Sequence, residues 1–258
     1  MTSPVTVITG ASEGIGEALS VRLATQGHRV VLAARRTPEL ERVAKACGGN
    51  AMVVTTDVTK RGDVERLRDA ALKRYGQVDV WVNNAGRGIN QKVLELTDDG
   101  LDAMLAVNLK SALYGMQAIT PHFIERKRGH LINVSSFLAR VPMATFRSGY
   151  NAAKAALNAL SANLRMDLAR DYPDIHVSVV MPGIVFTGFQ KNALGGTPHL
   201  GPGGTTGTKP QSVDEVADAI LGVMASPKAE IYTNPASAAI AQRYFADVQA
   251  FEAGLGGG

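Results

Sequence analysis

The chain alternates short apolar runs, rich in valine and isoleucine, with longer amphipathic stretches, and this alternation restricts it to few folds. The apolar runs read, in chain order, VTVIT, RVVLAA, AMVVTT, VDVWVN, HLINVS, HVSVVM and EIYTN. Strands of a parallel sheet are buried on both faces and are therefore apolar throughout. The pattern predicts an α/β fold with one doubly wound parallel sheet of about seven strands and helices on both faces.

The amphipathic stretches predict the helices that cover this sheet. Their expected positions are 14–26, 38–46, 61–75, 99–126, 149–171 and 213–225. Because α/β folds of about 250 residues commonly form one domain, the 258 residues predict a single domain, 1–258.

Residues 188–212 interrupt the alternation. They are dense in Gly, Pro and Thr and have neither helical nor strand periodicity. We expect a mobile substrate loop here, because long loops after strand ends form lids over ligands, and a disordered insertion is the alternative. A C-terminal helical tail is expected from about residue 236.

Composition argues against several classes of function. Cys47 is the single cysteine and no histidines stand at metal-ligand spacing, so neither a disulfide nor a metal site is predicted. The net charge of +4 comes from interspersed charges, which does not favour nucleic-acid binding. No run reaches the roughly 18 apolar residues of a membrane span, and no leader pattern precedes the first strand. We expect a cytoplasmic protein with no membrane partner.

A glycine-rich turn follows the first predicted strand. Gly10, Gly14 and Gly16 in TGASEGIG would let the backbone approach a pyrophosphate, whose charge would lie at the N-terminus of the next helix. The turn predicts a dinucleotide site, and an ordinary glycine-rich turn is the alternative.

The end of the second predicted strand bears on which dinucleotide binds. Enzymes that use NAD usually carry an acidic residue there, whereas this chain has Arg35 and Arg36, which favour the 2′-phosphate of NADP(H). Ser12 would add a hydroxyl donor. Glu13 opposes this preference unless it pairs with Arg35 or points outward.

Tyr150 and Lys154 lie four residues apart in SGYNAAKAAL, within a predicted helix. That spacing places both side chains on one helix face, with the ammonium near the phenol. A solvated lysine beside a half-buried tyrosine is the alternative.

These motifs together resemble those of the short-chain dehydrogenases/reductases. The resemblance covers residues 5 to about 187 and rests on the ordered motifs TGASEGIG, NNAG at 83–86, AVNL with Asn108, VSS at 134–136, Tyr150-x-x-x-Lys154 and Pro182-Gly183. It implies a Rossmann-type sheet with strand order 3-2-1-4-5-6-7 and hydride transfer to or from a nicotinamide ring.

The resemblance also implies catalytic roles. Tyr150 would be the general acid/base, and Lys154 would lower the pKa of the phenol and bind the nicotinamide ribose. Ser136 would polarise the substrate carbonyl, and Asn108 would hold a water linked to Lys154. Ser135 is the alternative serine, because Ser136 lies fourteen residues before the tyrosine where thirteen is the usual spacing.

Further cofactor contacts are carried over from the same motifs. Asp57 and Val58 would contact adenine, although Asp57 is also a possible N-cap for a helix beginning near Thr59. The remaining expected cofactor contacts, besides Tyr150 and Lys154, are Ile15 in the glycine turn, Asn84, Ala85 and Gly86 at the adenosine ribose, and Pro182, Gly183, Val185 and Thr187 near the nicotinamide.

The sequence thus predicts an NADP(H)-dependent oxidoreductase, a carbonyl reductase in class, acting on a small carbonyl or secondary alcohol. A non-catalytic NADP(H)-binding sensor or scaffold and a cofactor-recycling epimerase or dehydratase are the alternatives. An apolar substrate is favoured by side chains that could equally belong to the core, namely Leu138, Val141, Met143, Phe146, Phe186 and Phe189. We expect a homo-oligomer, either a tetramer or a dimer formed through the helices at 99–126 and 149–171.

Overall fold

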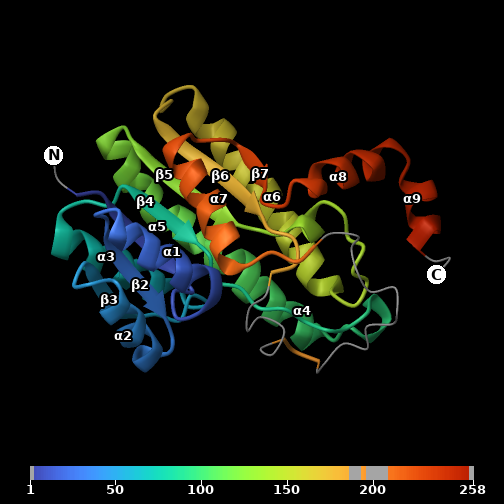
Figure 1. Ribbon diagram of the computed structural model, residues 1–258, viewed down its shortest axis with the longest axis horizontal. Coiled ribbons are helices and arrows are strands. Elements are labelled where there is room, and N and C mark those ends of the chain that lie inside the picture. The colour runs from blue at the N-terminus through green and yellow to red at the C-terminus, as the bar shows by residue number, and fades with distance from the viewer. Residues whose placement is uncertain (1–2, 186–192, 196–208, 256–258) are drawn as a thin grey trace.

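The computed structural model describes residues 3–185, 193–195 and 209–255. Within these ranges seven parallel strands form one sheet in the order β3-β2-β1-β4-β5-β6-β7 (Figure 1). This confirms the predicted fold class and strand order. The strands are β1 (Val5–Thr9), β2 (Arg29–Ala34), β3 (Ala51–Thr55), β4 (Val80–Asn83), β5 (Gly129–Val134), β6 (Ile175–Met181) and β7 (Glu230–Tyr232).

Helices cover both faces of the sheet, as its apolar strands require. One face packs against α1 (Gly14–Thr25), α2 (Thr37–Ala46) and α7 (Val213–Ala225). The other packs against α3 (Arg61–Tyr75), α5 (Ser111–Arg126) and α6 (Ser148–Ala169). Each layer buries its own apolar cluster, so the two clusters fix the helices that carry the candidate site.

The helix expected over 99–126 is not continuous. It comprises α4 (Asp98–Leu105), a π turn (Ala106–Lys110) and α5. A π turn widens the helix locally, which re-aims the side chains it contains, and such turns occur frequently at functional sites. Asn108 is the buried residue of this turn. Helical periodicity does not reveal the interruption, because the apolar pattern continues through it.

The expected C-terminal tail consists of two helices, α8 (Ala236–Ala246) and α9 (Val248–Leu255), which extend from the sheet domain at the β7 side (Figure 1). Their side chains pack on the short 3-10 helix Phe137–Ala139 and the segment after it. A second 3-10 helix, Val93–Glu95, lies between β4 and α4. Across the described ranges, no helix combines the length and hydropathy needed to cross a bilayer.

Candidate active site

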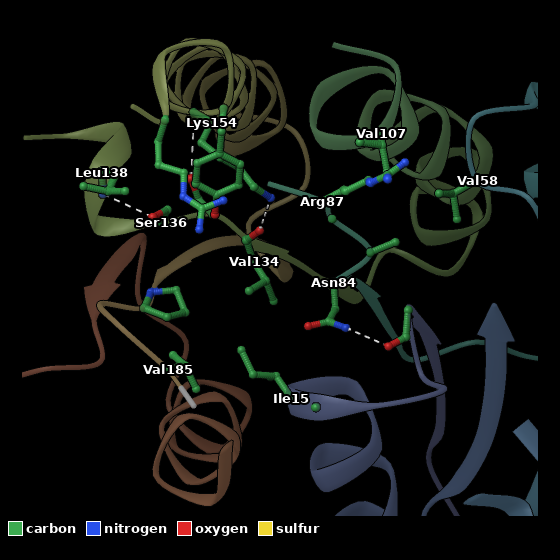
Figure 2. Close-up of a pocket in the computed structure, with 18 of the residues that line it drawn as sticks. Ile15, Val58, Asn84, Arg87, Val107, Val134, Ser136, Leu138, Lys154 and Val185 are labelled. Carbon is green, nitrogen blue, oxygen red and sulfur yellow. Dashed lines mark hydrogen bonds between the residues drawn. The ribbon is translucent and has the colours of Figure 1, made fainter. Parts of the chain in front are cut away.

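The carboxyl ends of β1 and β4 are tied together by the residues that begin the glycine turn. Thr9 Oγ1 accepts hydrogen bonds from the amides of Asn84, at 3.0 Å, and Ala85, at 3.1 Å. Asn84 Nδ2 in turn donates to the carbonyl oxygens of Thr9, at 3.0 Å, and Gly10, at 3.2 Å. Figure 2 shows Asn84 directed at this turn. The two strand ends therefore form one rigid edge of the site.

The glycine positions fit a dinucleotide that approaches this edge closely. Gly10 and Gly14 have φ values of 67° and 62°, which L side chains rarely adopt. A Cβ atom at Gly16 would overlap the Gly10 carbonyl oxygen, and one at Gly86 would lie 3.0 Å from Asn108 Oδ1. The Glu13 side chain does not cap α1, so it leaves the first-turn amides of the helix available to an anion.

The charges at the end of β2 are arranged differently from the sequence expectation for Glu13. Its carboxylate pairs with Arg36, at 3.1 Å, and not with Arg35. Arg36 also donates to Ser12 Oγ at 3.2 Å. Arg35 is exposed, lines the cavity and forms no ion pair with the described residues. Arg36 thus neutralises the Glu13 carboxylate, which was expected to disfavour the 2′-phosphate of NADP(H), and Arg35 faces the cavity.

Tyr150 and Ser136 meet where α6 begins and β5 has just ended. Tyr150 is 7% exposed, Ser136 is 6% exposed, and their hydroxyl groups share a hydrogen bond. Burial raises the pKa of the Tyr150 phenol, while the bond to Ser136 and the charge of Arg147 act in the opposite direction. Ser135 points elsewhere, since its hydroxyl donates to the Lys154 carbonyl oxygen at 3.4 Å.

Lys154 reaches across the face of Tyr150 toward the sheet. Its Nζ donates to the Val134 carbonyl oxygen at 2.8 Å (Figure 2). The same atom lies 5.9 Å from the centre of the tyrosine ring. Burial lowers the pKa of the Lys154 ammonium to about 7. Burial thus raises the pKa of the phenol and lowers that of the ammonium, and the expectation that the ammonium lowers the phenol pKa stays a prediction.

Asn108 holds the segment that follows β4. Its Oδ1 accepts from the Arg87 amide at 3.1 Å, and its Nδ2 donates to the Arg87 carbonyl oxygen at 2.9 Å. A Cβ atom at Gly86 would lie 3.0 Å from this Oδ1 and 3.7 Å from Lys154 Nζ. The π turn therefore places Asn108 against Gly86 and Arg87, close to the lysine.

A cavity of about 810 Å³ joins these groups into one site. Asn108 and Gly16 do not line the cavity, although each lies next to a residue that does. Thr187 lies outside the described residues. The other predicted site residues all line it, namely Gly10, Ser12, Glu13, Gly14, Ile15, Arg35, Arg36, Asp57, Val58, Asn84, Ala85, Gly86, Ser136, Tyr150, Lys154, Pro182, Gly183 and Val185.

Asp57 is not the cap of a helix near Thr59. Its Oδ1 accepts from the Thr59 amide at 3.1 Å, within a turn that precedes α3, and α3 itself begins at Arg61. The carboxylate lines the cavity beside Val58, so the turn holds it at the cavity wall. The capping alternative fails because the helix begins at Arg61, two residues later than expected, and its N-cap is Lys60.

The predicted substrate pocket is partly correct. Leu138, Met143 and Phe146 line the cavity near Tyr150. Val141 does not, because it is fully buried in the cluster beneath α8. Phe186, Phe189 and most of the loop expected at 188–212 lie outside the described residues.

Sequence reasoning missed Arg147, which also lines the cavity. It is 6% exposed, adjoins Phe146 with its guanidinium 5.4 Å from the ring centre, and precedes Tyr150 by three residues. The signal was present, because a charged residue at i−3 shares a helix face with the tyrosine. The predicted helix began at residue 149, so Arg147 was not assigned to the face that carries Tyr150.

A buried polar chain that sequence reasoning also missed anchors α6 to the sheet. Trp81 Nε1 donates to Asn83 Oδ1 at 2.8 Å, Asn83 Nδ2 donates to Asn133 Oδ1 at 2.9 Å, and Asn133 Nδ2 donates to Ser161 Oγ at 2.8 Å. Polar groups buried in this way must be paired, so the chain fixes α6 in one register. That register sets where Tyr150 and Lys154 project.

Comparison with known proteins agrees with this geometry. A family model described as short chain dehydrogenase matches residues 4–195. An "uncharacterized oxidoreductase" of Listeria innocua is 40% identical over 186 residues, covering 71% of this chain and 75% of its own. A Burkholderia cenocepacia short chain dehydrogenase in complex with NADP is 29% identical, with a TM-score of 0.81 over 98% of this chain and 97% of its own. A Brucella melitensis 3-ketoacyl-(acyl-carrier-protein) reductase complexed with NADH is 26% identical, with a TM-score of 0.77 over 90% and 96%.

Proposed function

Because the chain belongs to the short-chain dehydrogenase family, we propose that it is an NADP(H)-dependent oxidoreductase acting on a carbonyl or secondary alcohol. The observation that carries this proposal is the convergence of Ser136, Tyr150 and Lys154 on a cavity that continues to the glycine turn. A bound nicotinamide would supply the hydride-transfer chemistry. The residues at the Tyr150 end of the cavity would act on the substrate, and those at the glycine-turn end would bind the cofactor.

The chain's own groups would position the substrate and move its proton. The Ser136 hydroxyl would hydrogen-bond the substrate oxygen, and the Tyr150 phenol would donate a proton to that oxygen during reduction or accept one during oxidation. Lys154 would hold the nicotinamide ribose beside the phenol. Burial of all three side chains supports this role, since charge that develops on the oxygen is stabilised more strongly where water is excluded.

The preference for NADP(H) is supported by the charges at the end of β2. A carboxylate there would repel the 2′-phosphate, whereas this chain presents Arg35 to the cavity and neutralises Glu13 with Arg36. One matched relative is named with NADP and another with NADH, so the distinction rests on this chain's own residues.

The apolar lining near Tyr150 supports a small apolar or aromatic carbonyl compound as substrate. The activity test is NADPH oxidation against a panel of ketones, aldehydes and quinones. Turnover of an apolar ketone or aldehyde is expected. An absence of turnover across the panel, with NADPH bound, would favour the non-catalytic sensor.

Cofactor preference is tested by calorimetric titration of the protein with NADPH and with NADH. We expect tighter binding of NADPH, and we expect Arg35→Ala to narrow the ratio of the two Kd values about tenfold, as loss of charge-assisted hydrogen bonds implies. Arg29→Ala is the matched control, because Arg29 lies at the opposite end of β2 and should leave the ratio unchanged. Equal affinities for the two cofactors in the unmodified protein would contradict the preference.

A further inference from the structure

The first turn of α6 carries an arginine that the proposed mechanism does not use. Arg147 is the N-cap residue of α6, and Tyr150 is the third residue of the helix. Residues three apart on a helix are neighbours on its surface. Both side chains are more than nine-tenths buried and both line the same cavity. The start of α6 therefore places both side chains at the same cavity.

We propose that Arg147 is a positioning residue that supplies the permanent positive charge opposite the Tyr150 phenol. This inference rests on the proposed function, because it assigns a role in the same proton transfer. The two groups act on each other electrostatically, since the arginine opposes the burial that raises the phenol pKa, and the phenol opposes the burial that lowers the arginine pKa. An arginine keeps its proton at any pH at which the enzyme works.

Lys154 is poorly suited to be the only countercharge. Its Nζ is bound to the Val134 carbonyl oxygen, and burial lowers its pKa to about 7. Above that pH a growing fraction of the lysine is neutral, whereas a guanidinium remains charged. Arg147 therefore stabilises the phenolate in the pH range in which the lysine ceases to do so.

The other neighbours of Tyr150 are mostly apolar. Tyr150 belongs to a buried apolar cluster with Ile89, Met104 and Ala153. The partly buried side chains packed against this cluster are Leu96, Leu105, Val107, Leu138 and Leu194. The Ser136 hydroxyl is a polar neighbour and hydrogen-bonds the phenol. The further charged residues lining the cavity are Arg87 after β4 and, in the loops that follow β1, β2 and β3, Glu13, Arg35, Arg36 and Asp57.

Replacement of Arg147 need not disturb the helix start. The main-chain bonds at this position, from its amide to the Ala144 carbonyl oxygen at 2.9 Å and from the Asn151 amide to its own carbonyl at 2.8 Å, do not involve the side chain. Arg147→Met keeps an apolar stem without charge, and Arg147→Lys keeps a charge. Arg170→Met is the matched control, because Arg170 is a largely exposed arginine at the opposite end of α6.

The test is the pH dependence of kcat/KM for alcohol oxidation, in which the phenolate is the base. For Arg147→Met we expect the midpoint of the kcat/KM profile to rise by about one pH unit. Below the midpoints of both proteins, kcat/KM of the variant should be about tenfold lower than that of the parent. At high pH the two values should be equal. The midpoint of Arg147→Lys should stay close to that of the unmodified protein, because this variant keeps a charge. Arg170→Met should show no rise in the midpoint. NADPH titration of each variant verifies that it is folded.

Two results would overturn the inference. One is a profile of Arg147→Met with the unmodified midpoint. The other is an increase in KM confined to substrates that carry a carboxylate, which would make Arg147 a substrate anchor. Both results can be obtained only if the unmodified enzyme is active. If the proposed function fails, by contrast, neither the parent nor any variant oxidises or reduces a substrate.

Discussion

Lys154 shows how burial changes the properties of a residue whose position the sequence had suggested. Its side chain is 4% exposed, and its ammonium has a backbone carbonyl as hydrogen-bond acceptor. The spacing from Tyr150 predicted proximity on the helix, which the structure shows. It did not predict that burial lowers the pKa of the lysine, because this depends on the depth of the cavity and on β5, which lies twenty residues earlier.

Burial of Lys154 makes the stability of the protein depend on pH. Between about pH 7 and 10 the unfolded chain retains the ammonium proton that the folded chain has lost, so the free energy of unfolding rises with pH. The expected slope approaches about 1.4 kcal/mol per pH unit near pH 8. Urea unfolding at several pH values below about 8.5 measures it. The Cys47 thiol reduces the slope as the pH approaches that value, because burial raises the thiol pKa and the unfolded chain loses the thiol proton first.

Variants identify the lysine as the source of that slope. Lys154→Met should abolish it, because the variant has no proton to lose at this position. Lys45→Met removes an exposed lysine of α2 and should leave it unchanged. If the parent and Lys154→Met show the same slope, the pH dependence has another origin.

Among the elements, the junction of β1 with α1 is the most tightly constrained. The turn between them is held by Thr9 and Asn84, and Gly16 in the first turn of α1 faces the Gly10 carbonyl oxygen without room for a Cβ atom. This junction was predictable, since glycines after an apolar strand already indicate a close approach. The π turn within the helix expected at 99–126 was not, because its single extra residue leaves no mark on the apolar pattern.

Gly16→Ala should therefore displace the junction. The added methyl group would overlap Gly10 and the Asn84 side chain, and overpacking of this kind costs about 1–3 kcal/mol. We expect a loss of stability of that order in urea unfolding and at least about tenfold weaker binding of NADPH, since the turn would no longer follow the pyrophosphate.

Gly222→Ala provides the comparison for this substitution. Gly222 is an interior residue of α7 with no atom within 4 Å of an added Cβ, so the variant should keep its NADPH affinity and gain up to about 1 kcal/mol. Unchanged stability and affinity in Gly16→Ala would show that the junction tolerates a side chain.

For the molecule as a whole, the periodicity of the sequence was enough to predict the sheet and its layers, and the motifs that follow the strands predicted the edge at which the site lies. Apolar strands and their order along the chain carry that information locally. The pairing of Glu13 with Arg36, the placement of Val141 in the core and the contact of Arg147 with the cavity depend on side chains from separate elements. Such contacts are set by packing in three dimensions and leave no periodic signal.

The central claim is that Tyr150 transfers the proton in a hydride-transfer reaction, and Tyr150→Phe tests it most directly. Steady-state NADPH oxidation with an active carbonyl substrate should fall by at least about a hundredfold, as expected for loss of a general acid, while the Kd for NADPH changes little. Tyr114→Phe, which alters an α5 tyrosine stacked under Arg61, should retain full activity. Turnover by Tyr150→Phe at the parent rate would contradict the account.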